Sequence, residues 1–377
     1  GTPKGAVIRH NGALNHILAE QIELKLEQIT FLQTAPTSSD ISVWQFIAPL
    51  ITGGACVILD DVTDIPALIR HVDQHQVNIV ELVPVVLTLL LDYVSAQPAH
   101  RSMLPSLKVM MATGEAVPVP LINRWLKYFP TIPITNAYGP TEAADDVIQH
   151  TITQPLPVEK LSAPIGKPLA NFVIYILDAN LRLVPPGIVG EICISGIGVG
   201  EGYWNNPDRT AQSFVANPYA TSPDTERMYK TGDLGRWTQE GLIEYVDRLD
   251  NQIKIRGHRI ELGEIEAQLA KHPQTKECAV SVREDTPGDK YVAAYVIALD
   301  RNAKAAEFKH FLKQRLPIYM VPRYVTLVTT FPTTPAGKID RKNLPAPATR
   351  EEEQQTQSVP TSKLEIKLAG LWQKALK

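Results

Sequence analysis

The stretch ACVILDDVTDIPALIRHVDQHQVNIVELV, residues 55–83, decides the fold class. Residues 55–61 form an apolar run typical of a buried strand, and residues 77–83 form a second one. Between them, residues 65–76 place apolar side chains at helical spacing. A strand, an amphipathic helix and another strand in this order predict parallel strands joined by a covering helix.

The same alternation continues along the first part of the chain. Residues 104–114 predict a further strand, residues 119–130 a helix, and residues 132–142 a strand that runs into a turn. The most apolar stretch, residues 77–94, is interrupted by polar residues and a proline, which favours a buried strand and helix over a membrane span. Residues 1–170 therefore predict an α/β domain with a parallel, helix-covered sheet.

The character of the sequence changes after residue 170. Residues 171–249 alternate apolar and polar side chains between turn signals, which predicts an antiparallel β subdomain. Residues 250–345 predict a separate small α+β domain that contains a hairpin about Gly257. Residues 346–362 are polar and predict a linker, and residues 363–377 predict one amphipathic helix.

Composition excludes several classes of protein. Hydrophobic residues make up 44% of the chain, charged residues 20%, and the formal net charge is -3. This balance is that of an ordinary globular protein and gives no indication of a nucleic-acid or membrane partner. The three cysteines, Cys56, Cys193 and Cys278, are far apart and odd in number, so neither a disulfide framework nor a metal cluster is predicted. We expect a cytoplasmic protein.

Two stretches carry residue types suited to phosphate chemistry. GTPKG at residues 1–5 combines glycines with a lysine, as phosphate loops do, although a plain turn explains it equally well. NAYGPTEAADD at residues 136–146 places a tight turn at the end of a strand, where α/β sheets bind ligands. Its Tyr138 could stack on a base, and Thr141 and Glu142 offer hard oxygens for phosphate and Mg²⁺. The alternative is a solvated turn.

Two later stretches add charged side chains. YKTGDLGRW at residues 229–237 places Asp233 after a turn, where a carboxylate can bind both ribose hydroxyls or serve as a plain hairpin residue. DRLDNQIKIRGHRIELGEIE at residues 247–266 places four cationic side chains beside Asp250, at the predicted domain boundary. Such cations usually form a solvated face, but ligand sites concentrate at domain junctions. The four are Arg248, Lys254, Arg256 and Arg259.

In combination these stretches resemble the adenylate-forming enzymes, and specifically the adenylation domains of nonribosomal peptide synthetases. The motifs follow the family's order as GTPKG, NAYGPTE, GEICISGIGVGEGYWNNPDRTAQSF, YKTGDLGRW, DRLDNQIKIRGHRIELGEIE and TPAGKIDR. The resemblance implies that residues 1–249 are the C-terminal part of a large adenylation core, truncated on its N-terminal side. It also implies that residues 250–345 are a small mobile domain and that residues 363–377 begin a peptidyl carrier domain.

The resemblance implies an amino-acid adenylating ligase that uses ATP and Mg²⁺. Pyrophosphate would be released, and the acyl group would pass to the phosphopantetheine thiol of a carrier domain in cis, with other synthetase modules as further partners. Glu142 would bind the metal, Lys338 would bridge the substrate carboxylate and the adenylate, and Asp250 would be the hinge. The implied catalytic residues are Lys338, Lys254, Glu142 and Thr141. The implied ATP-binding residues are Lys4, Gly114, Glu115, Ala137, Tyr138, Gly139, Asp233 and Arg248.

The segment SDISVWQ at residues 39–45 matches the family's amino-acid recognition segment, in which Asp40 would pair with the substrate's α-ammonium group. The implied pocket residues are Asp40, Ile41, Trp44, Glu81, Met111, Thr113, Ala137, Asp145 and Asp146. One carboxylate suffices for the α-ammonium group, so the surplus of Glu81, Asp145 and Asp146 suggests a basic substrate such as arginine, ornithine or lysine. Alternatively, one or two of them face water, or the alignment slips near residues 81 and 111.

Two other functions stay open at this point. An acyl- or aryl-CoA ligase of the same superfamily would use soluble coenzyme A and would lack an aspartate at position 40 and the carrier helix. A catalytically silent scaffold is disfavoured by the retention of the implied functional residues Glu142, Asp233, Arg248 and Lys338.

Overall fold

The computed structural model describes residues 4–97, 103–249, 252–255, 257–285, 289–300, 303–333 and 339–347. The chain divides into two compact units, residues 2–260 and residues 261–377. The proposed hinge residue Asp250 and the proposed carrier helix at residues 363–377 lie outside the described residues. The domain boundaries inferred from the sequence therefore stay predictions.

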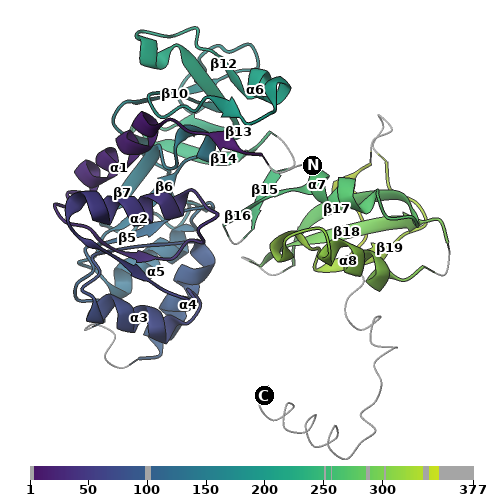
Figure 1. Ribbon diagram of the computed structural model, residues 1–377, viewed down its shortest axis with the longest axis horizontal. Helices are drawn as coiled ribbons and strands as arrows, with labels where there is room; N and C mark the ends of the chain where they lie inside the picture. Colours follow the sequence, from purple (N-terminus) through teal and green to yellow (C-terminus); the bar gives the residue numbers. More distant parts are fainter. Residues whose placement is uncertain are drawn as a thin grey trace, which may run out of the picture. The chain divides into compact units, whose positions relative to one another are not determined.

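The first unit contains a seven-stranded sheet in the order β3-β2-β4-β5-β6-β7-β8. Figure 1 labels β5, β6 and β7 in this sheet. The strands from β3 to β6 run parallel, and β7 and β8 are antiparallel to their neighbours. The strands are β2 (Thr30–Gln33), β3 (Ala55–Ile58), β4 (Ile79–Leu82), β5 (Val109–Ala112), β6 (Ile134–Tyr138), β7 (Ile148–Ile152) and β8 (Lys167–Pro168). The predicted parallel sheet is confirmed.

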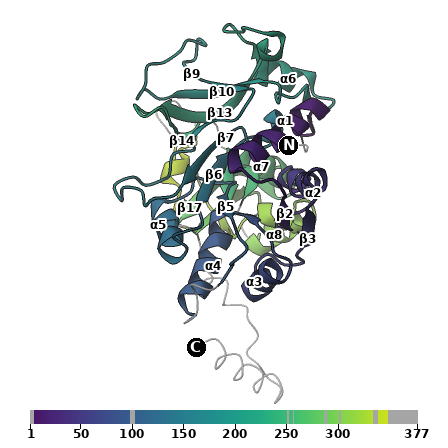
Figure 2. The same ribbon diagram turned by 90° about the vertical axis from the view of Figure 1, so that its left-hand side faces the viewer.

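Helices cover both faces of this sheet (Figure 2). On one face Leu32 and Met110 pack with α3, α4 and α5, and on the other face Ile79 and Met111 pack with α1 and α2. Because successive strand residues point to opposite faces, Glu81 lies on the side of α1 and α2. The helices are α1 (His10–Leu24), α2 (Ile41–Thr52), α3 (Ile65–Gln74), α4 (Pro84–Ser95) and α5 (Val119–Tyr128).

An antiparallel β subdomain follows in the same unit, in the order β12-β13-β10-β9 with β14 paired to β13 (Figure 2). Its core joins Ile174, Ile192 and Ile194 to Tyr138 and Ile148 of the seven-stranded sheet. The elements are β9 (Phe172–Leu177), β10 (Gly190–Gly196), α6 (Pro207–Ser213), β12 (Phe214–Ala216), β13 (Arg227–Trp237) and β14 (Ile243–Arg248). The predicted antiparallel character of this region is confirmed.

Two short pairings complete the first unit. The strand β1 (Ala6–Val7) pairs with β11 (Gly202–Tyr203). The strands β15 (Gln252–Ile255) and β16 (His258–Glu261) pair as the predicted hairpin about Gly257. Gly257 has a φ of 77°, a left-handed conformation that glycine adopts without strain.

The second unit has the α+β character predicted for the small domain, but the contact-based division places Gly257 and most of its hairpin in the first unit. The strands β17 (Thr275–Glu284) and β18 (Lys290–Ala298) are antiparallel, and β19 (Tyr324–Leu327) runs parallel to β18. The helices α7 (Leu262–Leu269) and α8 (Ala305–Lys313) complete it. Within the described parts of both units, every helix is too short or too polar to cross a bilayer.

Candidate active site

Asp40 forms the centre of the first group of candidate site residues. It is the N-cap of α2, where its carboxylate accepts hydrogen bonds from the Ile41 amide at 3.1 Å and the Ser39 hydroxyl at 3.2 Å. The Thr141 hydroxyl donates to the other carboxylate oxygen. The positive end of the helix dipole favours a negative charge at this position. Asp40, implied to bind the α-ammonium group, and Thr141, implied to act on phosphate, are thus in direct contact.

Glu81 occupies the buried face of β4 beside α2. The indole nitrogen of Trp44 donates to Glu81 Oε2 at 3.1 Å, and the amide nitrogen of Gln45 donates to the same oxygen at 3.3 Å. Glu81 Oε1 is buried and has no hydrogen-bond partner among the described residues. Met111 is the partner of Glu81 across β4 and β5, so the pocket positions near residues 81 and 111 are neighbours in the sheet.

Burial raises the pKa of the Glu81 carboxyl to about 7, although its hydrogen bonds with Gln45 and Trp44 oppose the shift. The folded protein therefore binds this proton more tightly than the unfolded chain does. The free energy of unfolding falls as pH rises from the ordinary carboxyl pKa of 4.5 to about 7. Glu81 in its ionised form thus destabilises the ligand-free pocket above neutral pH.

We predict that Glu81→Gln stabilises the ligand-free protein at pH 8 by about 2 kcal/mol. The amide oxygen can still accept from Trp44, while the buried charge is removed. Denaturant unfolding at pH 8 and at pH 5 measures the effect, and the gain should nearly vanish at pH 5, where the carboxyl is protonated. An equal gain at both pH values would contradict a charge effect.

The turn between β6 and β7 places two more carboxylates in the interior. Ala144 and Asp145 both have positive φ values, 65° and 81°, so the chain folds back tightly after Glu142. A Cβ on Gly139 would lie 1.8 Å from the Asp145 carbonyl oxygen, which explains the glycine at this position. Asp145 and Asp146 are only 6% and 1% exposed.

No permanently charged cation among the described residues compensates the burial of Asp145. Its Oδ2 lies 3.6 Å from Nε2 of His16, a residue of α1, and accepts no hydrogen bond from any described residue. Burial lowers the pKa of His16 to about 4, so the imidazole is neutral near pH 7. Burial, and then the charge of Asp40, raise the pKa of the Asp145 carboxyl well above its usual range.

Glu142 accepts hydrogen bonds from residues in and next to β11. Its backbone carbonyl accepts from the Gly200 amide at 2.9 Å, and its carboxylate accepts from the Tyr203 hydroxyl at 2.6 Å. The Trp204 amide donates to the Gly5 carbonyl at 2.7 Å, next to Lys4. Three stretches that are far apart in the sequence, residues 4–7, 139–146 and 200–204, thereby meet at Glu142.

The candidate ribose residues pair across two strands. Asp233 of β13 lies opposite Arg248 of β14, and the guanidinium donates to the carboxylate at 2.6 Å. The Tyr138 hydroxyl donates to the second oxygen of Asp233, also at 2.6 Å. Burial, followed by the charge of Asp233, raises the pKa of Tyr138 well above its usual range, so the phenol stays protonated.

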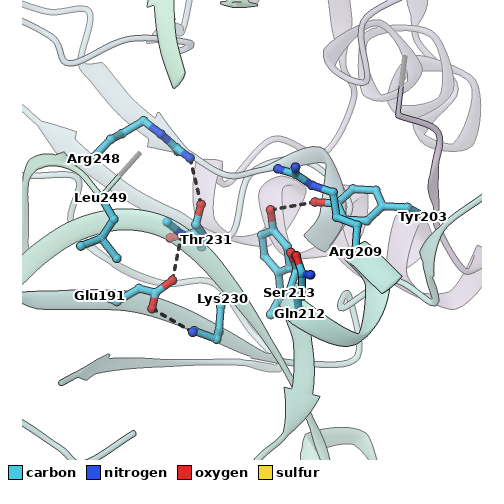
Figure 3. A pocket seen from close by; sticks show the side chains of 11 residues that line it. Glu191, Tyr203, Arg209, Gln212, Ser213, Lys230, Thr231, Arg248 and Leu249 are labelled. Carbon is cyan, nitrogen blue, oxygen red and sulfur yellow. Dashed lines mark hydrogen bonds and ion pairs between the residues drawn. The ribbon is translucent and has the colours of Figure 1, made fainter. Parts of the chain in front are cut away.

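A cavity of about 230 Å³ lies beside Arg248 and also reaches Tyr203 (Figure 3). Two of its cations are paired, because Arg248 binds Asp233 and Lys230 lies 3.6 Å from the Glu191 carboxylate. The cavity is also lined by a third cation, Arg209, whose guanidinium carbon lies 5.9 Å from the centroid of the Tyr203 ring. The cavity thus extends from the candidate ribose residue Arg248 to Tyr203, which donates a hydrogen bond to Glu142.

The residues present fit ATP and Mg²⁺ by their donor chemistry. An ionised carboxylate has about four lone-pair sites, so Asp233 can accept from ribose hydroxyls in addition to Arg248 and Tyr138. Each carboxylate oxygen has two lone-pair sites, so Glu142 can bind a metal ion while it accepts from the Tyr203 hydroxyl. Magnesium commonly binds one or two carboxylates together with substrate phosphates. Among the described residues, no group of three or more His, Cys, Asp or Glu side chains forms a preformed metal site.

The remaining predicted residues are placed as follows. The Gly257 amide donates to the Glu115 carboxylate at 2.6 Å, and Gly114 has a φ of 85°. The side chain of Lys254, and the whole of Asp250 and Lys338, lie outside the described residues. The predicted pocket residues that pack with the core around α2 are Ile41, Trp44, Met111 and Ala137, and Thr113 is buried. All of their proposed roles stay predictions.

Sequence reasoning missed several residues of this site. His16 and Glu20 of α1 and Gln149 of β7 are buried beside the predicted pocket, and Tyr203 binds Glu142. Gln149 is the partner of Ala137 across β6 and β7. The sequence did offer one indication for the first two of these residues. His16 and Glu20 are four positions apart, which places both on one face of a helix.

The chain matches known families over most of its length. Residues 1–204 match the AMP-binding enzyme family, and residues 264–338 match the C-terminal domain of AMP-binding enzymes. The chain belongs to the AMP-binding enzyme family. Curated relatives of the chain include peptide synthetases, and solved structures share its fold.

One curated relative is tyrocidine synthase 1 of Brevibacillus parabrevis, which is 39% identical over 386 residues, 100% of this chain and 33% of that protein. Another is a dimodular nonribosomal peptide synthase of Bacillus subtilis (strain 168), 41% identical over 350 residues, 92% of this chain and 14% of that protein. The chain thus spans a third or less of the length of these relatives.

Among solved structures, holo-PA1221, an NRPS protein with adenylation and PCP domains bound to a vinylsulfonamide inhibitor, has a TM-score of 0.79 and 28% identity. The match covers 96% of this chain and 59% of that chain. The amide bond synthetase McbA from Marinactinospora thermotolerans has a TM-score of 0.78 and 26% identity over 90% of this chain and 66% of its own. The recognition from six ordered motifs and the predicted fold class are confirmed.

Proposed function

We propose that the chain activates an amino acid with ATP, forming an aminoacyl-adenylate and releasing pyrophosphate. The contact between Asp40 and Thr141 carries this proposal. Asp40, which would be the counter-charge for an α-ammonium group, lies beside the turn that contains Glu142. The carboxylate carbon of an amino acid is two bonds from its ammonium nitrogen. An amino acid whose ammonium group binds Asp40 would therefore hold its carboxylate close to the candidate phosphate and metal residues.

In the proposed reaction a carboxylate oxygen of the amino acid attacks the α-phosphorus of ATP, and the bond from that phosphorus to pyrophosphate breaks. Glu142 would hold Mg²⁺, which when bound neutralises negative charge on the phosphate oxygens. Asp233 and Arg248 would bind and orient the ribose, and Tyr138 would hold Asp233 in place. Lys338 would bridge the two reacting anions, a role that rests on the sequence resemblance alone.

Transfer of the acyl group to the phosphopantetheine thiol of a carrier domain is the proposed second half of the reaction. The similarity to an NRPS protein that contains adenylation and PCP domains supports this partner. The similarity to multimodular synthases supports the proposal that other synthetase modules act with it.

We further propose that the activated amino acid carries a basic side chain. Glu81, Asp145 and Asp146 are all buried, which weighs against the alternative that one or two of them face water. Glu81 Oε1 and Asp145 Oδ2 are buried and accept no hydrogen bond from the described residues. Burying such atoms is costly unless a ligand satisfies them. A guanidinium or ammonium group would supply both the missing donors and the missing positive charge.

The test is ATP–pyrophosphate exchange by the full-length protein with a panel of amino acids, fatty acids and aryl acids. We expect exchange with arginine, ornithine or lysine, and we expect Glu81→Gln to lower kcat/KM for the preferred basic amino acid at least tenfold. A neutral preferred amino acid would refute the basic-substrate proposal and leave amino-acid activation standing. Exchange with fatty or aryl acids alone would refute amino-acid activation and favour the CoA-ligase alternative.

A further inference from the structure

Two polar residues of α1 lie against the acidic pocket, although no sequence motif includes them. His16 and Glu20 are four residues apart, on the same face of the helix, and are 2% and 0% exposed. Nδ1 of His16 lies 2.9 Å from the Asp146 carbonyl oxygen, and its ring meets the Trp44 ring edge-on at 5.7 Å. These contacts fix the buried face of α1 against the pocket residues on α2 and on the turn before β7.

Glu20 is a buried carboxylate whose hydrogen-bond partner among the described residues is a neutral amide. With the Gln149 side-chain amide oriented to satisfy both partners, its nitrogen lies 3.2 and 2.8 Å from the two Glu20 oxygens. Gln149 in turn lies beside the predicted pocket residue Ala137 in the sheet. No lysine or arginine among the described residues forms an ion pair with Glu20 or Glu81. In the part of the chain that the structure describes, no cation thus balances Glu20 when it is ionised.

The groups that face Glu20 are mainly carboxylates. Burial, and then the charges of Asp146 and Glu81, raise the pKa of Glu20 well above its usual range. The neighbouring titratable groups are His16 and the exposed Glu23 on its own helix, Glu81 on β4, and Asp145 and Asp146 on the turn before β7. Asp40 at the start of α2 acts in turn on Glu81 and Asp145. Because His16 is neutral, these groups include no permanent cation.

We propose that Glu20 is a further specificity-determining residue, a positioning carboxylate behind the pocket that selects a positively charged substrate side chain over a neutral one of the same shape. This inference rests on the proposed activation of a basic amino acid. Once a cationic side chain favours its ionised form, the negative charge of Glu20 acts over several ångströms in a dry interior, so Glu20 need not touch the substrate to favour its charge. Its own contact with Gln149 fixes where that charge lies.

The proposal includes a proton balance. In the empty pocket, mutual repulsion and burial keep part of the acidic cluster protonated. A cationic side chain favours the ionised carboxylates, so its binding releases protons to solvent. The affinity for a basic amino acid therefore rises with pH near neutrality. Glu20→Gln removes one of the groups that can release a proton, so the pH dependence of KM becomes shallower.

The test compares arginine with citrulline, which has nearly the same shape but no charge, in pyrophosphate exchange by the full-length protein. We expect Glu20→Gln to lower the ratio of kcat/KM for arginine over citrulline about tenfold, mainly through the KM for arginine. The matched control is Glu23→Gln, the same change at an exposed position of α1, where solvent screens the charge, so the ratio should change by less than roughly twofold. Glu20→Asp retains the charge and should keep more of the wild-type ratio than Glu20→Gln does.

A second readout separates electrostatic selection from a merely structural role. Calorimetric titration with arginine in buffers of different ionisation enthalpy counts the protons released, and Glu20→Gln should release fewer than the wild type. A Glu20→Gln variant that folds and keeps the wild-type ratio and proton count would overturn the role of Glu20 while leaving the basic-substrate proposal intact. A wild-type preference for citrulline would instead overturn the basic-substrate proposal itself.

Discussion

Replacing Asp40 with asparagine is expected to lower kcat/KM for the activated amino acid by about two to three orders of magnitude. The α-ammonium group of the substrate would lose its counter-charge in a partly buried position, next to Thr141. Asparagine is as good an N-cap as aspartate, so α2 should keep its stability. Pyrophosphate exchange measures the effect, and thermal unfolding verifies that the variant is folded.

The chain offers a matched control for this change. Asp64 is the N-cap of α3 and accepts from the Ala67 amide at 3.0 Å, in a helix on the opposite face of the sheet. Asp64→Asn makes the same chemical change and should leave exchange unaltered. A folded Asp40→Asn variant with wild-type kinetics would show that the α-ammonium group binds elsewhere.

Replacing Glu142 with glutamine is expected to lower kcat for exchange by about a thousandfold. The amide oxygen can still accept from Tyr203, so the local structure should persist, but the charge that would hold Mg²⁺ is lost. The concentration of Mg²⁺ needed for half-maximal exchange should rise together with the loss of rate. Titration of exchange activity with Mg²⁺ measures both quantities.

Glu226→Gln is a suitable comparison for this change, because Glu226 is exposed and belongs to the same unit. It should have no effect on either quantity. An unchanged requirement for Mg²⁺ in Glu142→Gln, even with a lower rate, would argue against Glu142 as the metal ligand. The carboxylate would then act through its contact with Tyr203.

The fold was predictable because its strands and turns are encoded locally. Residues 55–83 alternate in the way that a strand–helix–strand unit requires, and the structure contains that unit as β3, α3 and β4. The hairpin about Gly257 was predictable for the same reason. Strand periodicity also explains why Glu81 and Met111 share a face. Side chains two positions apart on a strand point to the same side of the sheet, and each of these residues follows an inward-facing residue by two positions.

The acidic pocket was only partly predictable, because α1 does not follow the usual hydrophobic pattern. Its residues Leu14, Leu18 and Ile22 form an apolar stripe that is exposed, whereas His16 and Glu20 are buried. A reading based on hydrophobicity alone turns this helix the wrong way. The burial of Glu20 depends on contacts with residues far along the chain, such as Gln149, which no local pattern reveals.

The contacts around Glu142 could not be predicted from spacing either. Tyr203 follows Glu142 by sixty-one residues, and their hydrogen bond depends on how the β subdomain packs against the sheet. The motif around Tyr203 was recognised as a family signature, but its physical role became visible only in the fold. Gly200 and Tyr203 hold the backbone and the side chain of the same residue.

The most direct measurement is a structure of the full-length protein with ATP analogue and the amino acid that it activates best. We expect the substrate's α-ammonium group on Asp40 and a positively charged side-chain terminus among Glu81, Asp145 and Asp146. A neutral side chain in that pocket, or an α-ammonium group remote from Asp40, would contradict the proposed recognition of a basic amino acid.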